Sequence, residues 1–266
     1  MFERITSPAN PKVKNLIKLG KGRGKDRKEN FIIEGTKEIE MALEAGVEIH
    51  SAFYCPEVCD DQEILDLIDR INPGRVFEIP ESIYRKVAYR DSTGGLLLVA
   101  RSEYVNLSDI KLANSPLVLI LESVEKPGNL GAILRTADAA NIDLVILCDP
   151  LTDLFNPNII RSSIGCIFTV PIVVCSSDAA ISWLRENKIS IFATDLATEI
   201  YYHQHDFTGA SAIVMGTEHS GISELWLREC DQKIKIPMRG KIDSLNVSTA
   251  TAILVFEAAR QRGFSN

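Results

Sequence analysis

Hydrophobic and polar positions alternate along this chain in a way that predicts two consecutive runs of short strands and helices. In the first run, short apolar segments rich in β-branched and aromatic residues predict strands, and amphipathic segments between them predict helices. The strands are expected at 31–33, 52–55, 75–79 and 96–100, and the helices at 36–45, 63–71 and 81–87. A polar, irregular stretch at 102–115 ends this run.

The second run begins at residue 116 and consists of short, continuous apolar segments divided by helices. The strands are expected at 117–121, 144–147, 170–174, 190–194, 212–215 and 233–236, and the helices at 132–140, 159–164, 178–187, 223–230 and 247–262. Such a pattern is typical of a parallel sheet covered on both faces. We therefore expect an α/β protein with a small α/β domain at 31–101, a linker at 102–115 and a larger parallel-sheet domain at 116–266.

Polar turns follow the carboxyl ends of several strands of the second run. They contain Asn129, Gly131, Thr194, Asp195, Gly216, Glu218 and the segment 237–246. Ligands of open parallel sheets bind beyond this edge. Each residue taken singly is better explained as part of a turn or a helix cap. Only their convergence on one edge predicts a site.

Composition narrows the class of protein. With 266 residues, 45% hydrophobic and 24% charged, the chain is typical of a globular protein with one large α/β unit or two domains. No apolar stretch approaches the roughly 20 residues that cross a bilayer, and residues 1–10 lack an apolar signal segment. We expect a cytoplasmic protein.

The cysteines and histidines do not predict a metal site. The six cysteines include no CxxC pair, and the four histidines are not ordered around them. Zinc sites and disulfide frameworks need tighter spacing. Free thiols and no bound metal are expected.

The net charge of −7 conceals a basic N-terminal arm, residues 1–30, in which 1–28 hold nine basic and two acidic residues. Within it, the glycine-punctuated segment GKGRGKDRK suits a loop that follows a nucleic-acid backbone, with contacts from Arg23, Lys25, Arg27 and Lys28. The alternative is a solvated charge run. A nucleoside-triphosphate site is excluded there, because the GxxxxGK[ST] spacing and a preceding strand are absent from the pattern.

Three segments of the second run together resemble a known family. NLGAILRTADAA (129–140), GTEHSG (216–221) and IPMRGKIDSLNVSTATAILVFEAAR (236–260) are similar to the three motifs of the SpoU, or TrmH-like, RNA ribose 2′-O-methyltransferases of the SPOUT superfamily. ITSPANPKVKNLIKL and FIIEGTKEIEMAL, near the start, resemble the substrate-binding domain of the ribosomal-RNA members. The resemblance covers nearly the whole chain.

The resemblance implies a trefoil knot in the catalytic domain, a homodimer with the site near its interface, and S-adenosylmethionine as methyl donor. A knot runs against the general rule for chain topology, so only the resemblance supports it. A Rossmann-type methyltransferase is disfavoured because GxGxxG is absent and the glycine-bearing turns come late in the sequence.

Carried over to this sequence, the resemblance places Gly216, Ile236 and Leu245 against the cofactor, largely through backbone groups, with Thr194 as a weaker addition. From the residues alone, plain core packing is the better explanation of Ile236 and Leu245, and only the resemblance favours a cofactor contact. The matching catalytic set is Asn129, Arg135, Glu218, Ser244 and Asn246.

Arg135 is open to two interpretations. Such an arginine is often assigned as general base, but a guanidinium has a pKa above about 12 and rarely releases a proton. Binding a phosphate is the second interpretation, and it does not require the guanidinium to release a proton. For Glu218 and Asn246, helix capping is the alternative, and for Arg135 it is a surface pair with Asp138.

The substrate implied is RNA, because ribose 2′-hydroxyls distinguish RNA from DNA. Arg161, in NPNIIRSSIG, matches a stretch that faces RNA, although an ordinary helical arginine is the alternative. The basic arm and separate first domain favour 23S ribosomal RNA, by analogy with relatives of this length. A tRNA ribose methyltransferase, or a non-catalytic RNA-binding or ribosome assembly factor, is the alternative.

Overall fold

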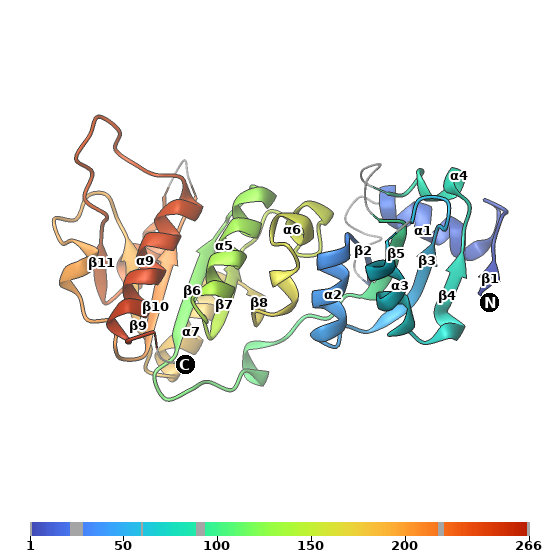
Figure 1. Cartoon of the computed structure of the whole chain (residues 1–266). Helices are drawn as coiled ribbons and strands as arrows, with labels where there is room; N and C mark the ends of the chain where they lie inside the picture. Colours follow the sequence, from blue (N-terminus) through green and yellow to red (C-terminus); the bar gives the residue numbers. More distant parts are fainter. Residues whose placement is uncertain (1, 22–28, 60, 89–93, 218–220, 265–266) are drawn as a thin grey trace. The chain divides into compact units, whose positions relative to one another are not determined.

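The computed structural model describes residues 2–21, 29–59, 61–88, 94–217 and 221–264 (Figure 1). The chain divides into two compact units. The first contains residues 1–103 and 153–169, and the second contains 104–152 and 170–266. Arg23, Lys25, Arg27, Lys28 and Glu218, which the sequence nominates as site residues, lie outside the described residues.

The first unit is a mixed sheet with helices. Its strands are β1 (Glu3–Arg4), β2 (Asn30–Glu34), β3 (Ile49–Tyr54), β4 (Val76–Glu78) and β5 (Leu96–Arg101), in the order β1-β4-β3-β5-β2. Strand β5 runs antiparallel to both β2 and β3. The helices are α1 (Pro11–Lys21), α2 (Thr36–Glu44), α3 (Gln62–Asp69), α4 (Glu81–Tyr84) and α6 (Pro157–Ser162), with short 3₁₀ turns at η1 (Pro73–Arg75) and η3 (Cys166–Phe168).

Helix α1 lies in the stretch that the sequence pattern assigns to a basic arm. Its residues Val13, Leu16 and Leu19 are three apart, so they share one face of the helix, and all three are buried. They pack with Phe53 and Val99 of the sheet in a common hydrophobic core. Part of the expected arm is therefore a folded element, and its lysines lie on the outer face of a packed helix.

The segment 153–169, which the sequence pattern groups with the second run, packs in the first unit. Phe155 stacks on Phe31 of β2 with ring centroids 4.3 Å apart, and Phe168 lies 6.0 Å from the same ring. Gly165 has φ +82°, and a Cβ there would lie 2.9 Å from the Cβ of Met41. Aromatic stacking and close approach to α2 therefore hold this segment to β2 and α2.

The second unit contains a six-stranded, wholly parallel sheet in the order β11-β9-β10-β6-β7-β8. Its strands are β6 (Leu117–Glu122), β7 (Leu144–Cys148), β8 (Ile172–Cys175), β9 (Ser190–Thr194), β10 (Ser211–Met215) and β11 (Gln232–Ile234). Its helices are α5 (Pro127–Ala139), α7 (Ser177–Glu186), α8 (Glu224–Glu229) and α9 (Val247–Gln261), with 3₁₀ turns η2 (Leu107–Asp109) and η4 (Tyr202–Gln204).

Both faces of this sheet are covered. Helices α5 and α9 lie side by side on one face (Figure 1). On the other face, Leu184 of α7 and Trp226 of α8 pack against strand residues such as Val118 and Val214. The prediction of an α/β fold with a parallel sheet is confirmed, and the knot stays a prediction.

The strand order defines where a ligand would bind. From β6 the chain proceeds outward to β7 and β8, then crosses to β9 on the other side of the neighbouring pair β6 and β10. The crevice at such a reversal, outside the carboxyl ends of the strands, is where open α/β sheets bind ligands.

Within the described part of the chain, no helix is both long and apolar enough to cross a membrane. Among the same residues, no cluster of three or more His, Cys, Asp or Glu side chains is placed to hold a metal ion.

Candidate active site

A cavity of about 530 Å³ opens beyond the carboxyl ends of β9, β10 and β11. Four separate stretches of the second unit line it: the end of β9, the turn after β10 with the start of α8, the end of β11, and the segment leading into α9. All four residues that the resemblance assigns to the cofactor are among them, namely Thr194, Gly216, Ile236 and Leu245, and Ser244 joins them. Thr194 and Leu245, which are 51 positions apart in the sequence, therefore line the same cavity.

The turn after β10 has a shape that requires glycine. Thr217 and Gly221 exchange two backbone hydrogen bonds, with N···O distances of 2.9 and 3.1 Å. Gly216 precedes this closed turn, and a Cβ on it would lie 2.1 Å from the carbonyl oxygen of Gly221. No side chain fits at that distance, so Gly216 allows the turn to close at the cavity wall.

A buried carboxylate ties this turn to the centre of the sheet. Glu122, the last residue of β6, is 8% exposed, and its Oε2 accepts a hydrogen bond from the backbone N–H of Ser223 at 2.7 Å. Ser223 directly precedes α8. The sequence pattern does not single out Glu122 as a site residue. The signal that could have done so is an acid closing the apolar strand LVLILE.

Two of the expected catalytic residues are in direct contact. Asn246 Nδ2 donates to Asn129 Oδ1 at 3.2 Å, across 117 positions of sequence. Asn129 lies in the first turn of α5, which begins at Pro127, five residues earlier than the pattern predicts. Proline is well suited to the first position of a helix because its missing N–H has no helical partner there anyway.

Asn246 is also the N-cap of α9. Its Oδ1 accepts hydrogen bonds from Ser248 N at 3.0 Å and from Ser248 Oγ at 2.6 Å. The capping interpretation and the site interpretation of Asn246 are therefore both realised, through different atoms. Its neighbours Leu245 and Val247 line the cavity, which places the asparagine pair at the cavity margin.

Other expected residues lie apart from this pair. Arg135 is exposed on α5 and does not line the cavity. Arg161 belongs to the first unit, where its guanidinium lies 3.9 Å from the buried carboxylate of Glu34. That ion pair gives Arg161 a structural role in addition to the RNA contact that the sequence suggests.

The cavity has apolar walls and an acidic rim. Met215, Ile222, Ile236, Leu245 and Leu254 supply apolar surface. Its charged lining residues are Asp195, Glu224, Lys235 and Asp243.

The apolar walls favour a ligand with a flat apolar part, and the excess of acidic over basic lining residues favours a ligand with a positive charge. Lys235 is itself paired with Glu199 at 3.5 Å, and Asp195 is paired with Lys233 at 3.5 Å. The Thr194 hydroxyl donates to the Val214 carbonyl at 3.0 Å, so it joins β9 to β10 beneath the cavity.

Comparison with known proteins gives a consistent result. Residues 116–256 match the model of the SpoU rRNA Methylase family, and residues 10–98 match that of the MRM3-like substrate binding domain. The chain is 29% identical over 255 residues to the 23S rRNA (guanosine(2553)-2′-O)-methyltransferase RlmP of Bacillus subtilis, covering 96% of this chain and 98% of that protein. It is 33% identical over 243 residues to the 23S rRNA (guanosine-2′-O-)-methyltransferase RlmB of Escherichia coli K12, covering 88% and 90%.

A solved structure shares the fold over almost the full length. The AdoMet-bound rRNA methyltransferase from Sinorhizobium meliloti superposes with a TM-score of 0.87 at 30% identity, covering 97% of this chain and 98% of that one. The family predicted from the three motifs is confirmed by these matches.

Proposed function

The chain belongs to the SpoU rRNA Methylase family, and we propose that it transfers the methyl group of S-adenosylmethionine to a ribose 2′-hydroxyl of 23S ribosomal RNA. The observation that carries this proposal is the contact between Asn129 and Asn246 at the margin of the cavity. It brings two motifs from opposite ends of the second unit together beside a ligand-sized space. The names of the relatives and the bound cofactor of the solved neighbour support the same reaction.

The cavity fits the cofactor on physical grounds. Its volume of about 530 Å³ lies within the roughly 300–1,000 Å³ typical of small-molecule sites. The apolar walls suit an adenine ring, and the acidic rim suits the sulfonium and ammonium charges. The cofactor supplies a methyl group that is already activated by the positive sulfur, so the reaction requires only positioning and removal of a proton.

The chain's own residues then have separate tasks. Ile236 and Leu245 hold the cofactor by contact, and Gly216 keeps its part of the cavity wall free of a side chain. Asn129, Ser244 and Asn246 offer polar atoms at the margin of the cavity, where they orient the acceptor ribose. The resemblance adds Glu218, which is in the same motif as Gly216, to the catalytic residues.

Arg135 acts as a phosphate clamp in this proposal. A guanidinium stays protonated at neutral pH, because its pKa exceeds about 12. It orients the nucleotide by paired hydrogen bonds to a phosphate. Because Arg135 is exposed and away from the cavity of its own chain, we assign it to RNA bound across the outer surface of α5.

Methyl transfer from labelled S-adenosylmethionine to unmodified 23S ribosomal RNA tests the proposal. We expect the product to contain one bond resistant to alkaline hydrolysis, since 2′-O-methylation removes the hydroxyl that attacks the phosphate. Transfer RNA as substrate tests the alternative target. A labelled but fully cleavable product would contradict ribose methylation, and no transfer to either RNA would leave an RNA-binding or assembly factor.

Arg135→Ala should lower the rate of transfer by at least about 100-fold, because misplacing the acceptor nucleotide by about 1 Å costs that much. Binding of S-adenosylmethionine, measured by calorimetry, should persist. Arg101→Ala, an exposed arginine of the first unit, is the matched control and should retain full turnover. Undiminished turnover of Arg135→Ala would remove Arg135 from the mechanism.

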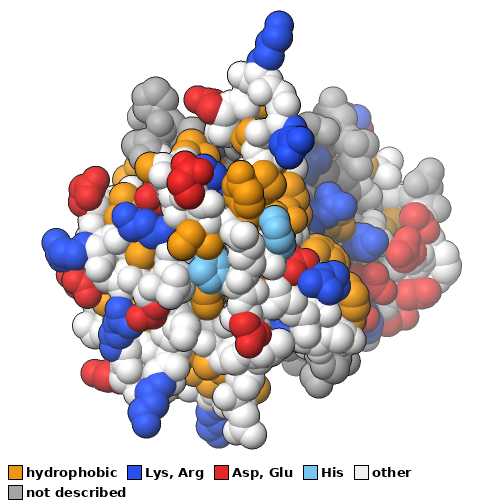
Figure 2. Space-filling model, turned by 90° about the vertical axis from the view of Figure 1, so that its left-hand side faces the viewer, with side chains coloured by type: hydrophobic (Ala, Val, Ile, Leu, Met, Phe, Trp, Pro, Cys, Tyr) orange, Lys and Arg blue, Asp and Glu red, His pale blue; other side chains and the backbone are white. Residues whose placement is uncertain are grey.

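We also propose that the protein is a homodimer acting in the cytoplasm. Large hydrophobic side chains are exposed on the second unit at Leu196, Ile200, Ile242 and Phe256. Figure 2 shows hydrophobic side chains gathered on one face of the molecule, next to histidine side chains. Such patches mark protein interfaces. Sedimentation equilibrium of the full chain would show a single species of twice the monomer mass, and a monomer would contradict this proposal.

A further inference from the structure

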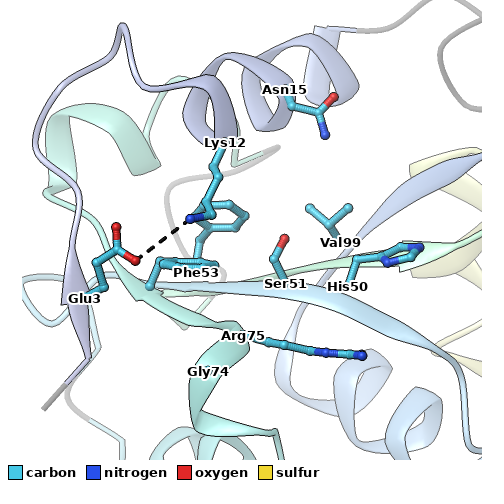
Figure 3. Close-up of a pocket in the computed structure, with 10 residues that line it drawn as sticks. Glu3, Lys12, Asn15, His50, Ser51, Phe53, Gly74, Arg75 and Val99 are labelled. Atoms are coloured by element: carbon cyan, nitrogen blue, oxygen red, sulfur yellow. Dashed lines mark ion pairs between the residues drawn. The ribbon is translucent and has the colours of Figure 1, made fainter.

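The first unit contains a second cavity, and none of the expected cofactor-binding or catalytic residues lines it. Its volume is about 380 Å³. It is lined by α1, by the first residues of β3, by η1 and by β4 and β5, with Glu3, Lys12, Asn15, His50, Ser51, Phe53, Gly74, Arg75, Phe77 and Val99. Figure 3 shows Lys12 and Asn15 reaching from α1 on one side, and Ser51, His50 and Arg75 on the other.

The floor of this cavity is apolar and rigid. Phe53 is 1% exposed and Val99 is 3% exposed, and both belong to the core beneath α1. Ser51, two positions from Phe53 on the same face of β3, leaves space because its side chain is small. A group that enters the cavity therefore meets apolar side chains that are already held in the core.

The rim carries positive charge from two unrelated elements. The ammonium of Lys12 lies 4.3 Å from the centroid of the Phe77 ring and 3.9 Å from Glu3, whose side chain is 61% exposed. Both contacts hold the lysine at the rim. The guanidinium of Arg75 donates one of its five N–H groups to the Ile49 carbonyl, which fixes its direction along the opposite edge.

An apolar floor, amide and imidazole groups at the wall, and two cations at the rim match the parts of a nucleotide. The base rests on the floor, its edges reach hydrogen-bonding groups such as Asn15 and His50, and the phosphate meets the cations. Duplex RNA does not present its bases in this way, whereas unpaired nucleotides do. The charge of α1 and the basic segment that follows it favour the same polyanion.

We propose that this cavity binds one unpaired nucleotide of the RNA substrate, with its phosphate between Lys12 and Arg75. The inference rests on the proposed function for the identity of the RNA. It deepens that function by assigning a recognition site to the first unit, separate from the methyl-transfer site. Glu3 is displaced from Lys12 when the phosphate binds, because a phosphate forms the stronger charge-assisted contact.

The first test is RNA affinity of the double variant Lys12→Gln/Arg75→Gln, measured by fluorescence anisotropy with an unmodified 23S ribosomal RNA transcript. We expect the Kd to rise about tenfold or more. The slope of log K against log salt should fall in magnitude by about 0.7, which is one phosphate contact to a single strand. The matched control is Lys37→Gln/Arg70→Gln, which removes the same charge from exposed residues of the first unit that do not line the cavity.

The second test fills the cavity without changing charge. Ser51→Leu should weaken RNA binding, whereas Ser108→Leu, at an exposed position of the second unit, should bind like the wild type. Wild-type affinity of Ser51→Leu would overturn the proposal, as would equal weakening by the Lys37/Arg70 control. Thermal unfolding checks the fold, and Lys12→Gln alone carries the test if Arg75→Gln impairs it.

Failure of this inference is distinguishable from failure of the proposed function. S-adenosylmethionine affinity, measured by calorimetry, should be the same in all these variants and the wild type. At saturating RNA, Lys12→Gln/Arg75→Gln should transfer methyl groups at the wild-type rate, so that the defect lies in KM for RNA. If the wild type methylates no RNA, the binding results still decide whether the cavity holds a nucleotide.

Discussion

At the scale of the single residue, Asn246 caps a helix and contacts Asn129, and it uses a different side-chain atom for each role. Its Oδ1 caps α9 through Ser248, while its Nδ2 donates to Asn129. Aspartate keeps the oxygen that caps the helix and lacks the donor. One substitution therefore separates the stability of α9 from the arrangement of the site.

Asn246→Asp should leave the free energy of unfolding within about 0.5 kcal/mol of the wild type, because Asp and Asn are equally good N-caps. Methyl transfer should fall by at least about 100-fold, since two oxygens would face each other where a hydrogen bond lies now. Urea denaturation and a transfer assay measure the two quantities.

Asn246→Ala is the control for this prediction. It removes both roles and should cost about 1 kcal/mol of stability as well as activity. Full activity in Asn246→Asp would show that the contact with Asn129 has no part in the reaction.

Single residues also show what sequence can predict. The convergence of Thr194, Gly216, Ile236 and Leu245 on one cavity follows from motifs that a family resemblance supplies. The motifs do not predict the roles of Glu122 and Arg75. Glu122 accepts a hydrogen bond from Ser223, and Arg75 donates one to the Ile49 carbonyl, and both contacts depend on the tertiary structure. No periodicity encodes such partners.

At the scale of elements, the last turn of α9 is held by a carboxylate. Glu257 accepts two hydrogen bonds from Arg260, both 2.8 Å, and a third at 2.8 Å from Gln261. Gln261 in turn bonds the carbonyl of His205 and the N–H of Phe207. The hydrogen bonds from Arg260 lower the pKa of Glu257 to about 2. The docking of α9 onto the 205–207 loop thus depends on an ionised Glu257.

This dependence predicts a pH effect with a definite sign. A carboxyl group whose folded pKa is depressed stabilises the protein above its unfolded pKa, near 4.3, and loses that contribution as pH falls toward 2. The wild type should be more stable than Glu257→Gln at pH 6, and the difference should shrink between about pH 4 and pH 2. Urea denaturation at several pH values measures it. A difference that stays constant would contradict the assignment.

Elements that the pattern misplaced share one physical cause. Helix α1 was not predicted because its lysines made the stretch resemble a basic arm, although Val13, Leu16 and Leu19 form an apolar stripe. Segment 153–169 lies in the sequence between strands of the second unit, yet Phe155 and Phe168 stack on Phe31 of the first. The sequence pattern predicts a helix at 159–164 but none at the position of α1, and in both cases the packing partner is set by tertiary contacts.

At the scale of the whole molecule, the end of the chain fastens the amino edge of the second sheet. Arg262, one residue beyond α9, donates to the carbonyls of Phe207 at 2.8 Å, Gly209 at 2.6 Å and Ser115 at 2.5 Å. Burial lowers the pKa of this guanidinium, and Asp143 and Asp206 oppose that shift. The two segments that precede β6 and β10 therefore meet at one side chain.

Replacing that side chain should loosen both segments at once. Arg262→Met keeps the aliphatic stem and leaves the carbonyls without their donor, which should lower the free energy of unfolding by about 1–3 kcal/mol. Arg262→Lys should recover only part of the loss, because a single ammonium cannot reproduce a planar fork of donors. Arg228→Met, at an arginine whose side chain is 69% exposed and paired with Glu229, should change stability by less than about 0.5 kcal/mol. If Arg262→Met unfolds at the same urea concentration as Arg228→Met, water replaces the guanidinium without cost and the C-terminal residues do not fasten the sheet.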